Sequence, residues 1–166
     1  MAMQVAMLRG VNLGRNRRVA MADLRGLAEE LGLEDVRTLL QSGNLIYRTR
    51  LPAPAAEMNL ESSIARYLLL TTEVFVRTDK QLSAIFEENP LAREAKRDPA
   101  RVHVMFCREK VKDLEVTGAK RERFVASGKE IFIYYPDGAG RSRLRFNIAG
   151  TSRNWNTVTK ILNALA

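Results

Sequence analysis

The chain has 166 residues, of which 46% are hydrophobic and 28% are charged, and its formal net charge is +8. This composition is typical of one globular domain, or of two small domains that share a core. The single cysteine excludes an internal disulfide and a zinc site built from several cysteines. No apolar run approaches the ~20 residues of a membrane span, and no secretory signal is visible, so we expect a cytoplasmic protein without a membrane partner.

The first half alternates apolar runs with helical periodicity. Residues 4–9 predict a buried strand, and residues 21–31 predict a helix that a glycine ends. Residues 36–48 predict a hairpin, residues 58–68 a second helix, and residues 74–77 a fourth strand. This β-α-β-β-α-β order is that of the ferredoxin-like split unit.

The second half begins with a capping box at residues 78–81, which opens a helix through residue 86. Residues 102–107 predict a strand, and residues 111–116 a short helix. A hairpin over residues 123–135 follows, and the chain finishes with an amphipathic helix that begins near Trp155.

The predicted fold class is therefore α+β, with two ferredoxin-like halves built on antiparallel sheets. We expect one half over residues 1–77. The second, over residues 78–166, is incomplete and ends in the amphipathic helix. The predicted core comprises Val5, Met7, Leu24, Leu27, Leu31, Val36, Ile133, Trp155 and Ile161.

The surplus positive charge gathers at the two ends of the sequence. Residues 1–20 contain four Arg and residues 138–166 contain four Arg and one Lys, and neither segment contains Asp or Glu. Both segments also carry Gly and Asn in predicted loops. A cationic, turn-rich surface attracts negatively charged partners, which makes both ends candidates for an anion site.

The first candidate site lies where the opening strand ends. In the split unit, the loop after the first strand and the turn of the hairpin lie at the same end of the sheet. Glycine lets a ligand approach the backbone, and Arg binds phosphate or carboxylate. The candidate residues are Arg9, Gly10, Asn12, Gly14, Ser42 and Asn44. The alternative is that these residues only turn the chain.

The second candidate site precedes the last helix. Its residues are Arg141, Ser142, Arg153 and Asn154. The first turn of a helix has free N–H groups, so a neighbouring Arg would complete an anion site. The alternative is that Ser152 or Asn154 caps the helix and Trp155 anchors it. We also predict that the Arg9 and Arg153 guanidinium groups share one surface concavity.

Groups suited to catalysis are few. His103 is the only histidine and lies in a predicted strand, and Cys107 has no second histidine or oxyanion motif nearby. We predict that neither is catalytic. The carboxylates show no metal-ligand spacing, so we expect no metal and no cofactor.

The aromatic residues suggest one further comparison. An RNA-recognition motif has the same topology and exposes aromatic side chains on its sheet. Its sequence signature is absent here, and most of the aromatic residues neighbour aliphatic ones, as in a core. The residues concerned are Tyr47, Phe75, Phe106, Phe132, Tyr134 and Tyr135.

Several motifs, in order along the chain, resemble the DUF1697 family. They are Leu8-Arg9-Gly10-Val11-Asn12-Leu13-Gly14, Met21-Ala22-Asp23-Leu24-Arg25, Asp35-Val36-Arg37-Thr38, Gln41-Ser42-Gly43-Asn44, Tyr135-Pro136-Asp137-Gly138 and Arg153-Asn154-Trp155-Asn156-Thr157. The resemblance implies an α+β fold of ferredoxin-like halves without an assigned function. Members usually have a longer segment, often with a helix, where this chain has only residues 144–150.

The sequence favours a binding module for an anionic ligand over an enzyme. The ligand could be a nucleotide, a phosphorylated metabolite or a nucleic-acid backbone. One alternative is an enzyme that acts on a phosphorylated or acyl substrate without a side-chain nucleophile. Another is a protein-interaction module whose motifs are structural. The oligomeric state stays open.

Overall fold

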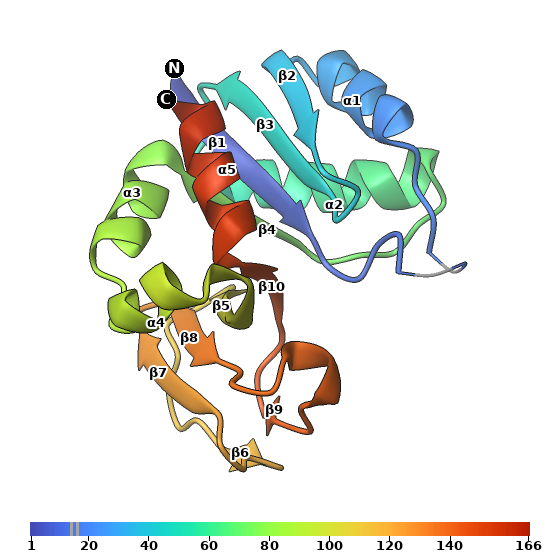
Figure 1. Ribbon diagram of the computed structural model, residues 1–166. Helices are drawn as coiled ribbons and strands as arrows, with labels where there is room; N and C mark the ends of the chain where they lie inside the picture. Colours follow the sequence, from blue (N-terminus) through green and yellow to red (C-terminus); the bar gives the residue numbers. More distant parts are fainter. Residues whose placement is uncertain (14, 16) are drawn as a thin grey trace. The chain divides into compact units, whose positions relative to one another are not determined.

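The computed structural model describes residues 1–13, 15 and 17–166 (Figure 1). The fold is α+β with antiparallel sheets, as predicted. The chain divides into two compact units. The first unit comprises Met1–Ala84 and Ile161–Ala166, and the second comprises Ile85–Lys160.

The first unit contains one four-stranded sheet and two long helices. Its elements are β1 (Ala2–Leu8), α1 (Met21–Glu30), β2 (Glu34–Leu39), β3 (Asn44–Thr49), α2 (Ala53–Tyr67), β4 (Val74–Thr78) and the start of α3 (Asp79–Glu87). The strand order is β2-β3-β1-β4, and every neighbouring pair is antiparallel. Apolar residues of α1 and α2, including Leu24, Leu60 and Ile64, pack in a cluster with residues of β1, β3 and β4.

The turn between β2 and β3 brings the chain close to the loop after β1. Gly43 has a φ of +84°, and a Cβ there would lie 2.7 Å from Cγ2 of Val11. Only glycine accepts both the backbone conformation and the close approach. The backbone N–H of Leu8 donates to the Gly43 carbonyl, 2.9 Å away. The loop after β1 and the hairpin turn therefore meet, as the split topology predicts.

Helix α2 protects the edge of this sheet. β4 is an outer strand, and two of its N–H groups donate to carboxylates on α2. The Val76 N–H lies 2.8 Å from Oε2 of Glu57, and the Val74 N–H lies 2.9 Å from Oε1 of Glu61. The two glutamates are one helical turn apart, so a single helix face satisfies the strand edge.

The second unit is built around another four-stranded antiparallel sheet, in the order β10-β5-β8-β7. It takes in the end of α3 and the start of α5. Its elements are α4 (Ala92–Arg97), η1 (Pro99–Arg101), β5 (Val102–Cys107), β6 (Val116–Thr117), β7 (Arg123–Ser127), β8 (Glu130–Tyr134), η2 (Ala139–Arg141), β9 (Arg145–Phe146), β10 (Gly150–Asn154) and α5 (Trp155–Leu165).

The two sheets have the same internal order. In each, the first strand of the sheet lies between the third and the fourth, and the second lies beyond the third. The connections differ. The first unit places α1 and α2 in its two crossovers, whereas the second has only β6 in one crossover and η2 with β9 in the other. β6 and β9 pair with each other, Val116 opposite Phe146.

The structure corrects two expectations about local structure and adds one strand. Residues 111–116 form no helix, because the loop uses their donors elsewhere: the Val111 N–H bonds the Gly128 carbonyl and the Glu115 N–H bonds Oδ1 of Asn147. Leu31, placed in the predicted core, is 36% exposed beyond the end of α1. Residues 150–154 form β10, for which the sequence gives no apolar alternation.

Candidate anion-binding site

The polar side chains of the first candidate site hold its loop in place. Nδ2 of Asn12 donates to the carbonyls of Val19 and Gln41, and its Oδ1 accepts from the Val19 N–H. Asn44 is fully buried and donates to the Leu39 carbonyl and to Oγ of Ser42, each at 2.9 Å. These contacts explain the loop conformation without a ligand. Gly14 lies outside the described residues.

Two arginines of this loop, Arg9 and Arg17, are also engaged. Nη1 of Arg9 lies 2.6 Å from Oε1 of Glu73. Arg17 donates from Nε to the Gly10 carbonyl and from Nη2 to the Thr71 carbonyl, both at 2.9 Å. A cavity of about 690 Å³ lies beside them, but its lining includes the carboxylates of Glu61 and Glu73 as well as the two arginines. The positive charge there is largely balanced.

The residues before α5 play structural parts too. Arg153 is only 6% exposed, and its Nη1 donates to Oγ1 of Thr151 at 2.7 Å and to the Ser152 carbonyl at 2.9 Å. Burial lowers its pKa to about 10. Oδ1 of Asn154 accepts the Thr157 N–H at 2.9 Å, which caps the first turn. Arg9 and Arg153 belong to different units, and their shared concavity stays a prediction.

A second cavity, in the second unit, has a different charge balance. Its volume is about 490 Å³, and we call it the Arg141 cavity. It is lined by Lys120, Arg121, Glu122, Tyr135, Asp137, Gly138, Arg141, Ser142 and Arg143. Four of these residues are cations and two are carboxylates. Two of the predicted site residues, Arg141 and Ser142, lie here together.

Two arginines that line the Arg141 cavity are left available to bind a ligand. Nη1 of Arg121 bonds Oδ1 of Asp137 at 2.8 Å, and Oγ of Ser142 donates to Oε1 of Glu122 at 3.2 Å. The guanidinium groups of Arg141 and Arg143 form no hydrogen bond or ion pair with any residue that the structure describes. Both residues are exposed.

Turn chemistry positions this wall of the cavity. Gly138 has a φ of +87°, and its N–H donates to the Tyr135 carbonyl at 3.0 Å, which closes the turn after β8. The 3-10 turn η2 follows, and Oγ of Ser142 accepts the Leu144 N–H at 3.1 Å. Arg141 therefore projects from a short, hydrogen-bonded loop rather than from a long flexible one.

Two titratable groups in the lining keep their usual charge at neutral pH. The Lys120 backbone N–H bonds the Glu122 carboxylate and lowers its pKa, so the group stays ionised. Burial raises the pKa of Tyr135, so its hydroxyl stays protonated. The Tyr135 ring packs edge-on against His103, with ring centroids 5.0 Å apart.

One comparison with known proteins shows the family. A model of proteins of unknown function, DUF1697, matches residues 1–132. The chain belongs to the DUF1697 family. A solved structure, that of the conserved bacterial protein SP0830 from Streptococcus pneumoniae, superposes with a TM-score of 0.79 at 24% identity, over 99% of both chains. No curated protein matches the chain. The neighbour shows the fold and carries no functional argument.

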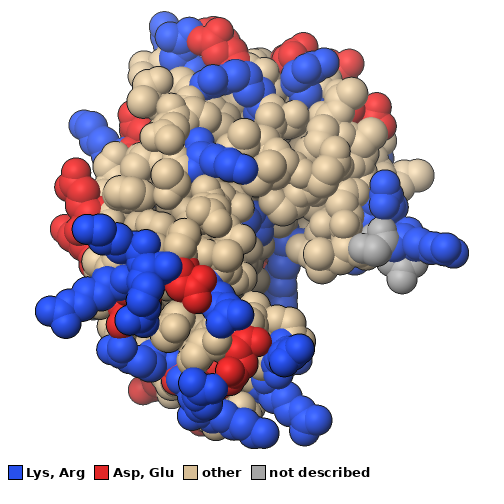
Figure 2. Space-filling view, in the orientation of Figure 1, with Lys and Arg blue, Asp and Glu red and all other residues tan. Residues whose placement is uncertain are grey.

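The sequence did not single out the other seven residues that line the Arg141 cavity in this DUF1697 protein: Lys120, Arg121, Glu122, Tyr135, Asp137, Gly138 and Arg143. A signal was present, because the second unit holds 16 Lys and Arg against 10 Asp and Glu, whereas the first holds 11 against 9. The difference appears when charge is counted within each unit, and comparing the two ends of the sequence with its middle hides it. Figure 2 shows Lys and Arg side chains gathered over the part of the view that contains α4 and β7.

The remaining expectations concern catalysis, aromatic residues and the membrane. Cys107 is buried, and no cluster of three His, Cys, Asp or Glu within residues 1–13, 15 and 17–166 could hold a metal ion. Of the six aromatic residues considered above, Tyr47, Phe75, Phe106 and Phe132 are buried, whereas Tyr134 and Tyr135 are partly exposed. In the part of the chain that the structure describes, no helix has the length and apolar character to cross a membrane.

Proposed function

We propose that this DUF1697 protein binds an anionic ligand through the Arg141 cavity. The observation that carries the proposal is the pair of exposed guanidinium groups, Arg141 and Arg143, in a cavity of about 490 Å³ with two further cations. Guanidinium groups bind phosphate and carboxylate oxygens through paired N–H donors. The volume falls in the range of small-molecule sites.

Binding is favoured over catalysis by the chemistry of the lining. Neither His nor Cys is among the described residues that line the Arg141 cavity, and the Tyr135 hydroxyl stays protonated because burial raises its pKa. The cavity offers charge and hydrogen-bond donors, which bind an anion.

Among the other predicted residues, Asn12, Asn44 and Arg153 make hydrogen bonds that hold their own segments in place. Contributions to an anion site from Arg9, Gly10, Asn12, Gly14, Ser42, Asn44, Arg153 and Asn154 stay predictions. We also propose that residues 1–77 and 78–166 are two ferredoxin-like halves. The shared strand order supports this proposal, with β6 and β9 standing in the crossovers where the first half has helices.

Pyrophosphate titration of ¹⁵N-labelled protein tests the anion-binding proposal. We expect saturable amide shifts concentrated at residues 138–143 and 120–122. The double variant Arg141→Ala/Arg143→Ala should lose them, and Arg25→Ala/Arg50→Ala, which removes two exposed arginines of the first unit, should keep them. Shifts centred on Arg9 and Arg17, or no saturable shift, would overturn the assignment.

A further inference from the structure

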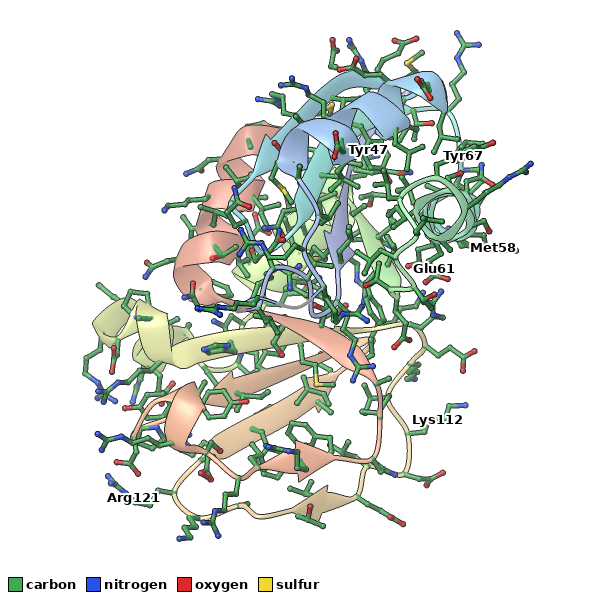
Figure 3. The ribbon with its side chains drawn as sticks, turned by 90° about the vertical axis from the view of Figure 1, so that its right-hand side faces the viewer. Tyr47, Met58, Glu61, Tyr67, Lys112 and Arg121 are labelled. Atoms are coloured by element: carbon green, nitrogen blue, oxygen red, sulfur yellow. The ribbon has the colours of Figure 1, made fainter. Side chains whose placement is uncertain are left out.

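The charge of the second unit extends well beyond the Arg141 cavity. Its surplus of Lys and Arg over Asp and Glu is larger than the cavity alone supplies. Several exposed cations of this unit lie outside the cavity lining and have no ion-pair partner among the described residues. They are Arg93, Lys96, Arg97, Lys110 and Lys112. Lys112 and Arg121 both project from the surface of this unit (Figure 3).

From this distribution we infer that the anionic ligand is a single-stranded nucleic acid, with one nucleotide seated in the Arg141 cavity and neighbouring phosphates on the surrounding cations. The inference rests on the proposed function and names its ligand class. A small phosphorylated metabolite would be neutralised within the cavity and would leave the outlying cations unused. A polyanionic backbone contacts the cavity and the outlying cations together. Each phosphate that a cation contacts releases counterions, so every such contact adds to the affinity.

The lining of the cavity also suits a nucleotide better than a bare phosphate. About 490 Å³ is far more space than one phosphate group fills, and the aromatic residue Tyr135 lines the same cavity as Arg141 and Arg143. Aromatic rings bind unpaired bases by stacking, whatever the base, while arginines hold the backbone. His103 packs against Tyr135 and fixes its ring.

The single strand is favoured over the duplex by the same geometry. A paired base is stacked inside its helix and cannot reach a ring within a cavity, so Tyr135 would contribute nothing to duplex binding. Within the sheet of the second unit, Phe106 and Phe132 of β5 and β8 are buried, and Phe124 and Tyr134 are only partly exposed. A duplex would therefore meet only the outlying cations.

Fluorescence anisotropy with a labelled oligouridylate tests the inference, with matched duplex RNA and pyrophosphate as competitors. We expect log K to fall with log salt by about 0.7 for each phosphate contacted, and Arg141→Ala/Arg143→Ala to reduce that slope by about 1.4. Tyr135→Ala should weaken binding at least about fivefold while Tyr135→Phe keeps it. Arg25→Ala/Arg50→Ala should leave affinity and slope unchanged.

The possible failures are distinguishable. If pyrophosphate binds through Arg141 and Arg143 but the oligonucleotide binds no more tightly and without a steep salt dependence, the nucleic-acid inference is overturned and the anion site stands. Equal affinity for duplex, or an affinity that Tyr135→Ala leaves unchanged, overturns the single-strand assignment. If neither probe binds, both the ligand class and the anion site are wrong.

Discussion

Burial sets the protonation of His103, which lies on β5. Desolvation lowers its pKa from 6.5, and a hydrogen bond with the backbone of Ala100 opposes that shift only in part. The folded state therefore binds fewer protons than the unfolded state in the acid range. Stability from this residue is fully present above about pH 6.5 and is lost as the pH falls below that value.

We expect His103→Gln to flatten the acid limb of the stability curve. Urea unfolding of both proteins, measured from neutral pH downwards, should give a free-energy difference that shrinks as the pH falls through the histidine range. Because Gln does not titrate, the variant lacks the proton uptake of the unfolded state. A difference that stays constant with pH would contradict the assignment of the lowered pKa.

Trp155 anchors the start of α5. Its side chain is 9% exposed and stacks on Phe86 of α3, with ring centroids 4.8 Å apart and an interplanar angle of 16°. Trp155→Ala should lower the free energy of unfolding by about 3–5 kcal/mol. Urea denaturation measures the change, with Met58→Ala as the control because Met58 is 67% exposed. Similar losses in both variants would refute the anchoring role.

At the scale of elements, the carboxylates of α2 protect an edge strand. Removing Glu57 takes away the carboxylate that accepts the Val76 N–H. Removing Glu61 takes away the carboxylate that accepts the Val74 N–H. Each change to Ala should cost about 1–3 kcal/mol, because an unsatisfied donor remains. Amide hydrogen exchange shows which glutamate accepts from which N–H. Glu57→Ala should speed exchange most at Val76, and Glu61→Ala should speed it most at Val74. The same amide responding to both variants would contradict these contacts.

Gly118 connects the crossover containing β6 with the wall of the Arg141 cavity. Its φ is +72°, and a Cβ would lie 2.1 Å from the Arg143 carbonyl oxygen, which is backbone and cannot move aside alone. Gly118→Ala should therefore destabilise the protein, shift the Arg143 amide resonance and weaken pyrophosphate binding. The matched control is Gly26→Ala in α1, where a Cβ has open space and Ala raises helix stability by about 0.5–1 kcal/mol. Unchanged pyrophosphate affinity in Gly118→Ala would show that the approach of Gly118 to Arg143 does not shape the anion site.

At the scale of the whole molecule, the last residues return to the unit in which the chain begins. Residues 161–166 cluster with the first unit, where Nη2 of Arg37 donates to the Ala164 carbonyl at 2.6 Å. Ile161 is fully buried. Ile161→Ala should cost about 2–5 kcal/mol. Amide exchange in β2 and β3 measures the effect, and unchanged protection in those strands would show that the C-terminus does not stabilise the first unit.

Several elements follow from short-range chemistry and were predictable. The capping box forms as the spacing indicates: the Gln81 N–H bonds Oγ1 of Thr78, and the Thr78 N–H bonds Oε1 of Gln81. Gly32 takes a φ of +85° just beyond α1. The predicted helix over residues 58–68 is longer and begins at Ala53, because Pro54 fits the first turn of a helix.

The candidate site was predictable only in part. Arg141 and Ser142 were found because a glycine-rich turn and surplus charge coincide in the sequence. Lys120 and Arg121 come from another crossover, and only sheet pairing brings that segment to the same cavity. Asn12 and Asn44 appeared ligand-directed in the sequence, but the Asn12 side chain bonds the distant Gln41 carbonyl and the Asn44 side chain bonds its own hairpin turn.

The sequence by itself determined the fold class, the first β-α-β-β-α-β order, the helix caps and the DUF1697 family, because periodicity, turn residues and motifs are local properties of the chain. The tertiary structure alone decided which arginines are available. Arg9 is paired, Arg153 is buried, and Arg141 and Arg143 face a cavity. The reason is physical: an arginine's freedom depends on partners brought close by strand pairing, and that distance in space is absent from a linear charge pattern.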